Sequence, residues 1–126
     1  MHLETFIRQM PKVELHVHLE GSIQPETLLA LAERNHVKLP ATTIAGLRQW
    51  YTFTDFAHFI EIYLTISSCI CSPEDIELIA REFLRGQGAQ NIQHSEVTFT
   101  PYTHFSLNRR IPFEDQLAAL SRARAW

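Results

Sequence analysis

Two histidines separated by a single residue, His16 and His18, are the residues in this sequence best suited to chemistry. They lie in the segment 13–18, Val-Glu-Leu-His-Val-His, where apolar and polar residues alternate as in a β-strand. Side chains at i and i+2 of a strand point to the same face, with alpha carbons ~6.6 Å apart. Two imidazoles at that spacing can bind one metal ion at Zn–N distances of ~2.0–2.1 Å. The pattern therefore predicts two metal ligands on one strand.

The alternative is a structural role for this pair, because histidines also pack on half-buried strands. The position of the pair favours a functional role, since barrel enzymes place catalytic groups at the end of a strand, and a turn containing Gly21 follows here. The alternation also predicts that Val13, Leu15 and Val17 face covering helices. Glu14 is then expected on the histidine face, either orienting a ligand or pointing to solvent.

The rest of the sequence alternates between helical and strand-like patterns. Apolar residues at helical spacing predict a short helix over residues 3–10, which ends at Pro11. Capping residues or prolines predict further helices from residue 25 to 35 or 36, around 44–50, from 56 onward, from 73 to about 86–88, and from 113 onward. Residues 92–99 are predicted to form the second strand.

The order strand, helices, strand, helix is typical of a parallel α/β fold. Two strands cannot form a stable parallel sheet with both faces covered, and a complete eight-stranded barrel needs ~250 residues. We therefore expect this parallel α/β fold to be incomplete in this chain. Its exposed strand edges predict a tendency to self-associate.

The overall composition excludes several classes of partner. The chain is 45% hydrophobic and has a net charge of −3 from 11 basic and 14 acidic residues. Because no cluster of Lys and Arg is present, neither nucleic acid nor an anionic membrane surface is an expected partner. No signal peptide and no apolar stretch of ~18 residues occurs, so no membrane span is expected. Cys69 and Cys71 are too close for an unstrained disulfide, and free thiols favour a cytoplasmic protein.

Several other residues have two interpretations. Phe56, Phe59 and Tyr63 fall on one helical stripe, which is more typical of a core than of a gate over a ligand. His94 and His104 each stand alone, so a packing or surface role is favoured for both.

The second half of the chain offers fewer candidates for chemistry. Glu96 on the second strand is expected either to face the barrel interior and bind water or substrate, or to be a buried structural acid. The pair Arg109-Arg110 is predicted to lie in a solvated loop. Phe113, Leu117 and Leu120 mark the apolar face of the last helix.

The segment 11–22, Pro-Lys-Val-Glu-Leu-His-Val-His-Leu-Glu-Gly-Ser, continuing to Pro25–Leu28, resembles the first strand and loop of the adenosine and adenine deaminase family of amidohydrolases. The segment 95–101, Ser-Glu-Val-Thr-Phe-Thr-Pro, is similar to that family's second strand. Residues 53–59 resemble the helical segment near its substrate entrance. The resemblance covers nearly the whole chain and implies that residues 1–126 are the N-terminal segment of a single (β/α)8 TIM-type barrel domain. It also implies zinc-dependent hydrolytic deamination of adenosine or a related 6-aminopurine, with release of ammonia.

The resemblance also implies roles for individual residues. His16 and His18 would be two ligands of one Zn²⁺ ion, Glu20 would reach toward the substrate's sugar or its equivalent, and Gly21 would allow the backbone to approach the ligand closely. The family's third histidine ligand, proton-donating glutamate, catalytic histidine and metal-binding aspartate come from later strands. No catalytic residue is therefore expected in this chain, and little or no turnover by it alone.

The sequence leaves the substrate open. Glu20 replaces the aspartate common in adenosine-specific members, and glutamate occurs in relatives that act on adenine or on a modified adenosine such as aminodeoxyfutalosine. The segment 98–102, Thr-Phe-Thr-Pro-Tyr, lacks the Phe-Phe-Asp-Pro-Gln sequence frequent in adenine enzymes. Two other hypotheses are a different His-x-His barrel hydrolase, acting on phosphate esters or cyclic amides, and a truncated non-catalytic chain that serves as a binding partner.

Overall fold

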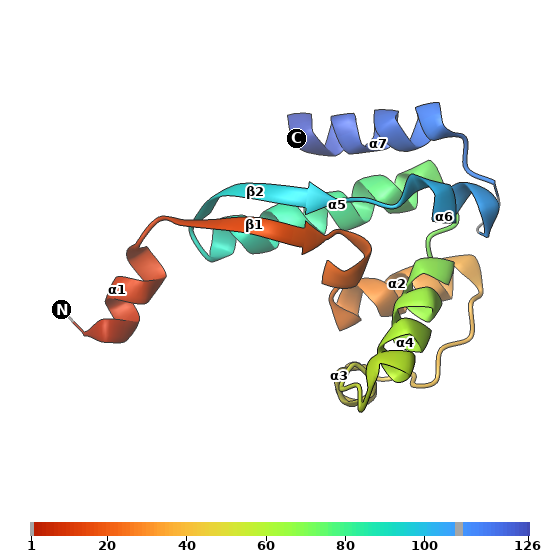
Figure 1. Ribbon diagram of the computed structural model, residues 1–126, viewed down its shortest axis with the longest axis horizontal. Coiled ribbons are helices and arrows are strands. Elements are labelled where there is room, and N and C mark those ends of the chain that lie inside the picture. The colour runs from red at the N-terminus through yellow and green to blue at the C-terminus, as the bar shows by residue number, and fades with distance from the viewer. Residues whose placement is uncertain (1, 108–109) are drawn as a thin grey trace.

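Two parallel strands form the centre of the computed structural model, which describes residues 2–107 and 110–126. Strand β1 (Lys12–His18) pairs with β2 (Ile92–Thr98). Helix α5 (Pro73–Ala89) lies behind both strands and returns the chain to the start of β2, and α7 (Phe113–Ala125) packs on α5 beside β2 (Figure 1). The sheet therefore has one face covered by helices, as in one part of a β/α barrel.

The remaining helices lie at the two ends of the strands (Figure 1). Helix α1 (Leu3–Gln9) precedes β1 and extends away from the rest of the chain. At the other end, the 3-10 helix η1 (Glu20–Ser22) follows β1, α6 (Pro101–Ser106) follows β2, and three helices gather below them: α2 (Pro25–Asn35), α3 (Ile44–Trp50) and α4 (Phe56–Ser68). The predicted helices and strands are confirmed, whereas η1 and α6 were not predicted.

The ends of the helices are set by capping residues and prolines close to them in the sequence. The side chains of Thr43, Asp55 and Ser72 each accept a hydrogen bond from a backbone N–H in the first turn of α3, α4 and α5. Helix α2 begins at Pro25 and ends at Asn35, and it is capped by His36, whose φ of 56° places it in the left-handed region. These signals lie within a few residues of each helix end, which explains why sequence alone predicted the boundaries.

The two faces of β1 differ from those predicted by strict alternation. Val13 and Leu15 are 60% and 61% exposed, whereas Glu14 accepts a hydrogen bond at 2.8 Å from Gln87 on helix α5. The pairing register with β2 shifts between Glu14 and Val17, so the alternation is interrupted there, and Val17 packs against the core. The prediction that Val13 and Leu15 face helices, with Glu14 on the histidine face, is therefore wrong.

The core lies between the sheet and helices α2, α4 and α5. Its fully buried side chains include Leu19, Leu28, Leu31, Leu47, Ile70 and Ile76. On α4 the buried residues are Ile62, Ile66 and Ser67, and Phe56 is 74% exposed. The core interpretation of the stripe Phe56, Phe59 and Tyr63 is wrong for the two phenylalanines, because α4 turns a different side inward.

The last helix also turns an unexpected side inward. On α7, Gln116, Ala119 and Ala123 are buried, whereas Phe113 and Leu117 are exposed. Small residues let α7 approach α5 closely, and this packing overrides the larger apolar side chains. Of the predicted loop pair, Arg109 lies outside the described residues and Arg110 is exposed.

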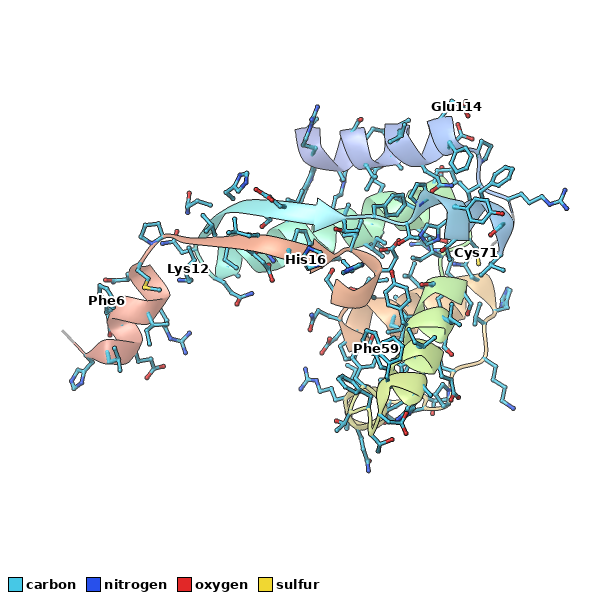
Figure 2. The ribbon with its side chains drawn as sticks, in the orientation of Figure 1. Phe6, Lys12, His16, Phe59, Cys71 and Glu114 are labelled. Atoms are coloured by element: carbon cyan, nitrogen blue, oxygen red, sulfur yellow. The ribbon has the colours of Figure 1, made fainter. Side chains whose placement is uncertain are left out.

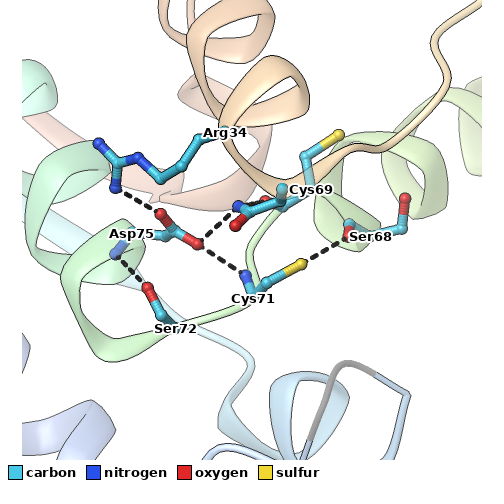
Figure 3. A network of polar contacts seen from close by, with 7 residues as sticks. Arg34, Ser68, Cys69, Cys71, Ser72 and Asp75 are labelled. Atoms are coloured by element: carbon cyan, nitrogen blue, oxygen red, sulfur yellow. Dashed lines mark hydrogen bonds and ion pairs between the residues drawn. The ribbon is translucent and has the colours of Figure 1, made fainter.

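A buried carboxylate fixes the junction between α2, α4 and α5 (Figure 3). Asp75 is fully buried and accepts hydrogen bonds from Arg34 at 2.7 Å, Asn35 at 2.8 Å and the backbone N–H of Cys71 at 2.9 Å. Cys69 and Cys71 are both in the reduced thiol form, as predicted. Within the part of the chain that the structure describes, no helix is long and apolar enough to cross a bilayer.

Candidate metal and substrate site

His16 and His18 lie together on the exposed side of β1, where the strand ends. Their ring centroids are 5.1 Å apart and their planes meet at 82°. In the view of Figure 2, His16 lies on β1, to the upper left of Phe59 on helix α4. Two imidazoles on one tetrahedral ion, each at ~2.0–2.1 Å, place their ring centroids ~5 Å apart. The spacing of the two rings is therefore compatible with one shared zinc ion.

The two histidines provide only part of a ligand set. Among the described residues, no group of three or more His, Cys, Asp or Glu side chains is arranged to hold a metal ion. A catalytic zinc site usually takes three protein ligands and one open position. The donor chemistry thus fits zinc for two positions, and any further protein ligand has to come from outside these residues.

Glu20 lies two residues after His18, at the start of η1, in a buried polar cluster. Its side chain is fully buried, and Oε1 accepts hydrogen bonds from the backbone N–H of Thr100 at 2.9 Å and from Nε2 of His104 at 3.0 Å. The ring of Phe99 stacks on His104, with centroids 5.1 Å apart and 19° between the planes. The cluster joins the segment after β1 to the segment after β2.

The charge on Glu20 is favoured by these contacts. Burial raises the pKa of its carboxyl, but the hydrogen bonds from His104, from its own backbone N–H and from Thr100 outweigh burial and leave the pKa below its usual range. Its second oxygen, Oε2, has no hydrogen-bond partner among the described residues. Burial, with the nearby Glu20 charge, raises the pKa of the Tyr63 hydroxyl.

Tyr63 separates this cluster from the exposed histidines. Its ring meets the His18 ring edge-on at 6.5 Å between centroids, and it also covers Gly21, where an added Cβ would lie 3.7 Å from the tyrosine ring. That is an ordinary contact distance, so the described surroundings of Gly21 would accept alanine. Phe59 lies beside Tyr63, with ring centroids 6.4 Å apart, and extends the aromatic wall along α4.

The other candidate residues have different environments. His94 is exposed on β2, with Nε2 3.7 Å from Glu96, whose side chain is 64% exposed rather than buried. The surface role predicted for His94 is confirmed. His104 is fully buried and bonded to Glu20, a relationship that the sequence reasoning missed. The signal was Thr100-Pro101, which starts a helix as well as ending a strand and places His104 one turn later.

Comparison with known proteins decides the family. Residues 11–125 match the family model described as adenosine deaminase. This chain belongs to the adenosine deaminase family. The adenine deaminase of Geotalea uraniireducens is 41% identical over 121 residues, which are 96% of this chain and 34% of that protein. The chain therefore spans about a third of the length of the curated relatives it matches.

Solved structures of the family superpose well on this chain. The adenine deaminase of Arthrobacter aurescens has a TM-score of 0.80 and 35% identity, covering 91% of this chain and 35% of that structure. A Burkholderia ambifaria amidohydrolase crystallised with bound Zn has a TM-score of 0.78 and 28% identity, covering 94% and 32%. The predicted fold is confirmed: the chain is the N-terminal portion of a (β/α)8 barrel.

Proposed function

We propose that this chain is the N-terminal part of a metal-dependent hydrolase that removes the exocyclic amino group of adenine as ammonia. The observation that carries the proposal is the His16–His18 pair, whose rings share one exposed side of β1 at 5.1 Å in a chain 41% identical to an adenine deaminase. In the reaction, water adds at the ring carbon that bears the amino group, and the amino group leaves as ammonia.

His16 and His18 are proposed to hold zinc through one ring nitrogen each. Zinc, when bound, makes water a better nucleophile near neutral pH. Tyr63 and Phe59 of the same chain would form the apolar wall against which a flat purine ring packs. The acid and the remaining ligands would come from the later units of the barrel.

Adenine is proposed over adenosine for two reasons. Four matching relatives, at 36–41% identity, are adenine deaminases. In addition, Oε1 of Glu20, the residue that the family resemblance directs toward a sugar, is occupied by Thr100 and His104. Only Oε2 of this fully buried carboxylate is left without a partner among the described residues, so Glu20 has less freedom to bind ribose hydroxyls, whereas a free base needs no such contact.

Zinc binding by the purified chain tests the first part of the proposal. NMR signals of the seven histidines are followed during zinc titration, and those of His16 and His18 are expected to shift first. The double variant His16→Ala/His18→Ala should lose this response, and His94→Ala is the matched control because His94 is also an exposed strand histidine. Equal zinc affinity of the double variant and the control would refute the metal assignment.

Substrate choice requires the complete barrel. Ammonia release by the chain joined to the remaining barrel units is expected to be at least 100-fold faster in kcat/KM for adenine than for adenosine. A preference for adenosine would contradict the assignment of adenine as the substrate but would leave the assignment of the metal site unaffected. Release of phosphate or opening of a cyclic amide, without ammonia from either purine, would favour the other His-x-His hydrolases.

A further inference from the structure

The pairing of the two strands is displaced over a short stretch of β1. On both sides of this stretch the strands share one register, in the pairs Lys12–Ile92 and Val17–Val97. Within it, Glu14 faces Ser95, which is one residue further along β2 than that register predicts. Because β1 has returned to the shared register at Val17, the displacement is local and needs a local cause.

His16 lies where β1 returns to the shared register. Two residues of β1, Leu15 and His16, face the single residue Glu96 of β2, which is the arrangement of a β-bulge. Leu15 and His16 are both exposed, although neighbours in a regular strand point to opposite faces. The direction of the His16 ring, whose centroid lies 5.1 Å from that of His18, therefore depends on the bulge.

The side chain of Gln87 bonds the displaced pair from the side of helix α5. Gln87 is only 9% exposed. Its Nε2 donates a hydrogen bond to Oε2 of Glu14 at 2.8 Å, and its Oε1 accepts one from the hydroxyl of Ser95 at 3.2 Å. One amide thus uses its donor and its acceptor to hold both members of the displaced pair.

The apolar pattern of β1 opposes this arrangement. Val17 packs against the core, and strict alternation from Val17 would turn Val13 and Leu15 toward α5 as well. Instead these two side chains are 60% and 61% exposed, and the carboxylate of Glu14 takes the side of α5. The hydrophobic effect therefore favours a regular strand, so a polar contact has to select the bulged one.

We infer that Gln87 is a positioning residue, which holds the bulge of β1 and thereby sets the direction of His16 beside His18. Its amide acts through Glu14, two residues before His16. Specification of register is the best-attested use of buried polar contacts. The part of the inference that concerns the bulge rests on strand geometry, and its consequence for zinc rests on the proposed function.

The variant Gln87→Leu tests the bulge directly, because leucine is of similar size and has no donor. The Glu14 carboxylate is expected to turn outward, and Glu14 should then pair with His94 instead of Ser95. Contacts between backbone hydrogens, measured by NMR, report this change. New contacts should also appear between the methyl groups of Leu15 and α5. A merely stabilising role for Gln87 would lower stability without moving these contacts.

Zinc affinity gives the second readout. The zinc dissociation constant, measured from the NMR signals of His16 and His18, should rise about 10–100-fold in Gln87→Leu, as when an outer partner of a metal ligand is removed. Gln93→Leu is the matched control, because Gln93 is an exposed glutamine on β2 whose amide bonds Asn91. It should change neither the strand pairing nor the affinity.

An exchange of the two side chains should restore the bulge. In Glu14→Gln/Gln87→Glu, an amide on β1 donates to a carboxylate on α5, which the hydroxyl of Ser95 also reaches. The pairing and the zinc affinity of the unaltered chain are expected to return. If Gln87→Leu does not fold, Glu14→Thr removes the same bond without leaving a charge, and the same change of pairing is expected of it.

Three results would overturn the inference: a folded Gln87→Leu or Glu14→Thr chain that still pairs residue 14 with Ser95, an exchange variant that does not recover this pairing, or a lost bulge with unchanged zinc affinity. Absence of zinc binding by the unaltered chain, together with a bulge that Gln87→Leu removes, would reject the proposed function and leave the role of Gln87 in the bulge standing.

Discussion

The side chains of Glu20 and His104 meet in the interior at 3.0 Å, although 84 residues separate them in the sequence. Both are fully buried, and each comes from the segment that follows a strand, Glu20 after β1 and His104 after β2. The contact fixes the two segments relative to each other at the ends of the strands. It is a positioning contact, because neither group lies on the exposed side that carries the histidine pair.

Removing one partner of this pair is expected to destabilise the chain strongly. His104→Ala removes the side-chain donor to the buried Glu20 carboxylate and leaves only backbone N–H donors, and breaking a buried pair costs about 3–5 kcal/mol. Urea unfolding followed by circular dichroism measures the change. His94→Ala should cost less than about 0.5 kcal/mol, because His94 is an exposed surface residue. Similar losses for both variants would contradict the buried-pair interpretation.

Asp75 is expected to be the most sensitive single carboxylate in the helical part of the chain. Asp75→Ala leaves Arg34, Asn35 and the Cys71 N–H without their acceptor and should lower the free energy of unfolding by about 3–5 kcal/mol (Figure 3). The neighbouring Glu74→Ala removes only an exposed acid in the first turn, worth about 1 kcal/mol or less. Urea midpoints of the two variants compare them directly, and equal midpoints would show that the network adds no stability.

The thiol of Cys69 is expected to resist alkylation. Its ionisation is expected to lower the free energy of unfolding of the chain at alkaline pH. Its thiol is fully buried, and burial raises its pKa from 9.0 to about 11. Because the thiol ionises more readily in the unfolded chain, its contribution to stability is complete below pH 9 and is lost as the pH rises toward 11. The Cys69→Ala variant should show a smaller decline over that interval.

Alkylation separates the two thiols. At pH 8, iodoacetamide should react at least 100-fold more slowly with Cys69 in a Cys71→Ser chain than with Cys71 in a Cys69→Ala chain. In concentrated urea the two rates should become similar, because exposure then no longer differs. Fast labelling of Cys69 in the folded chain would show that its site opens to solvent.

The sequence predicted element positions well and side-chain environments less well, for a physical reason. Helix boundaries depend on neighbouring residues, such as the Ser72 cap, and were predictable from them. The orientation of Val13 depends on a register shift with a strand about eighty residues away, which no local pattern encodes. The burial of His104 likewise needs Glu20, so a lone histidine in the sequence gives no sign of its partner.

In the candidate site, too, local relationships were predictable from the sequence and tertiary ones were not. The His16–His18 spacing is local, and their proximity was predictable from a strand. Tyr63 approaches His18 only because α4 packs against the turn that contains Gly21, a tertiary relationship. The helical periodicity of α4 alone therefore could not predict that Tyr63 lies beside the histidine pair.

Replacing Gly86 with alanine is expected to raise the stability of the chain, in contrast to the substitutions above. It lies inside helix α5, where a Cβ would meet no atom within 4 Å, so Gly86→Ala gains helix propensity without a clash. The free energy of unfolding should rise by about 0.5–1 kcal/mol, measured in urea. Gly46→Ala in α3 is the comparison, because a Cβ there lies 3.0 Å from Ala41 and from Thr43 Oγ1. Its gain should be smaller or negative, since that contact opposes the same propensity.

An equal gain at both positions would show that α3 moves freely enough to relieve the contact, and a loss at Gly86 would show that its surroundings are more crowded than the structure describes.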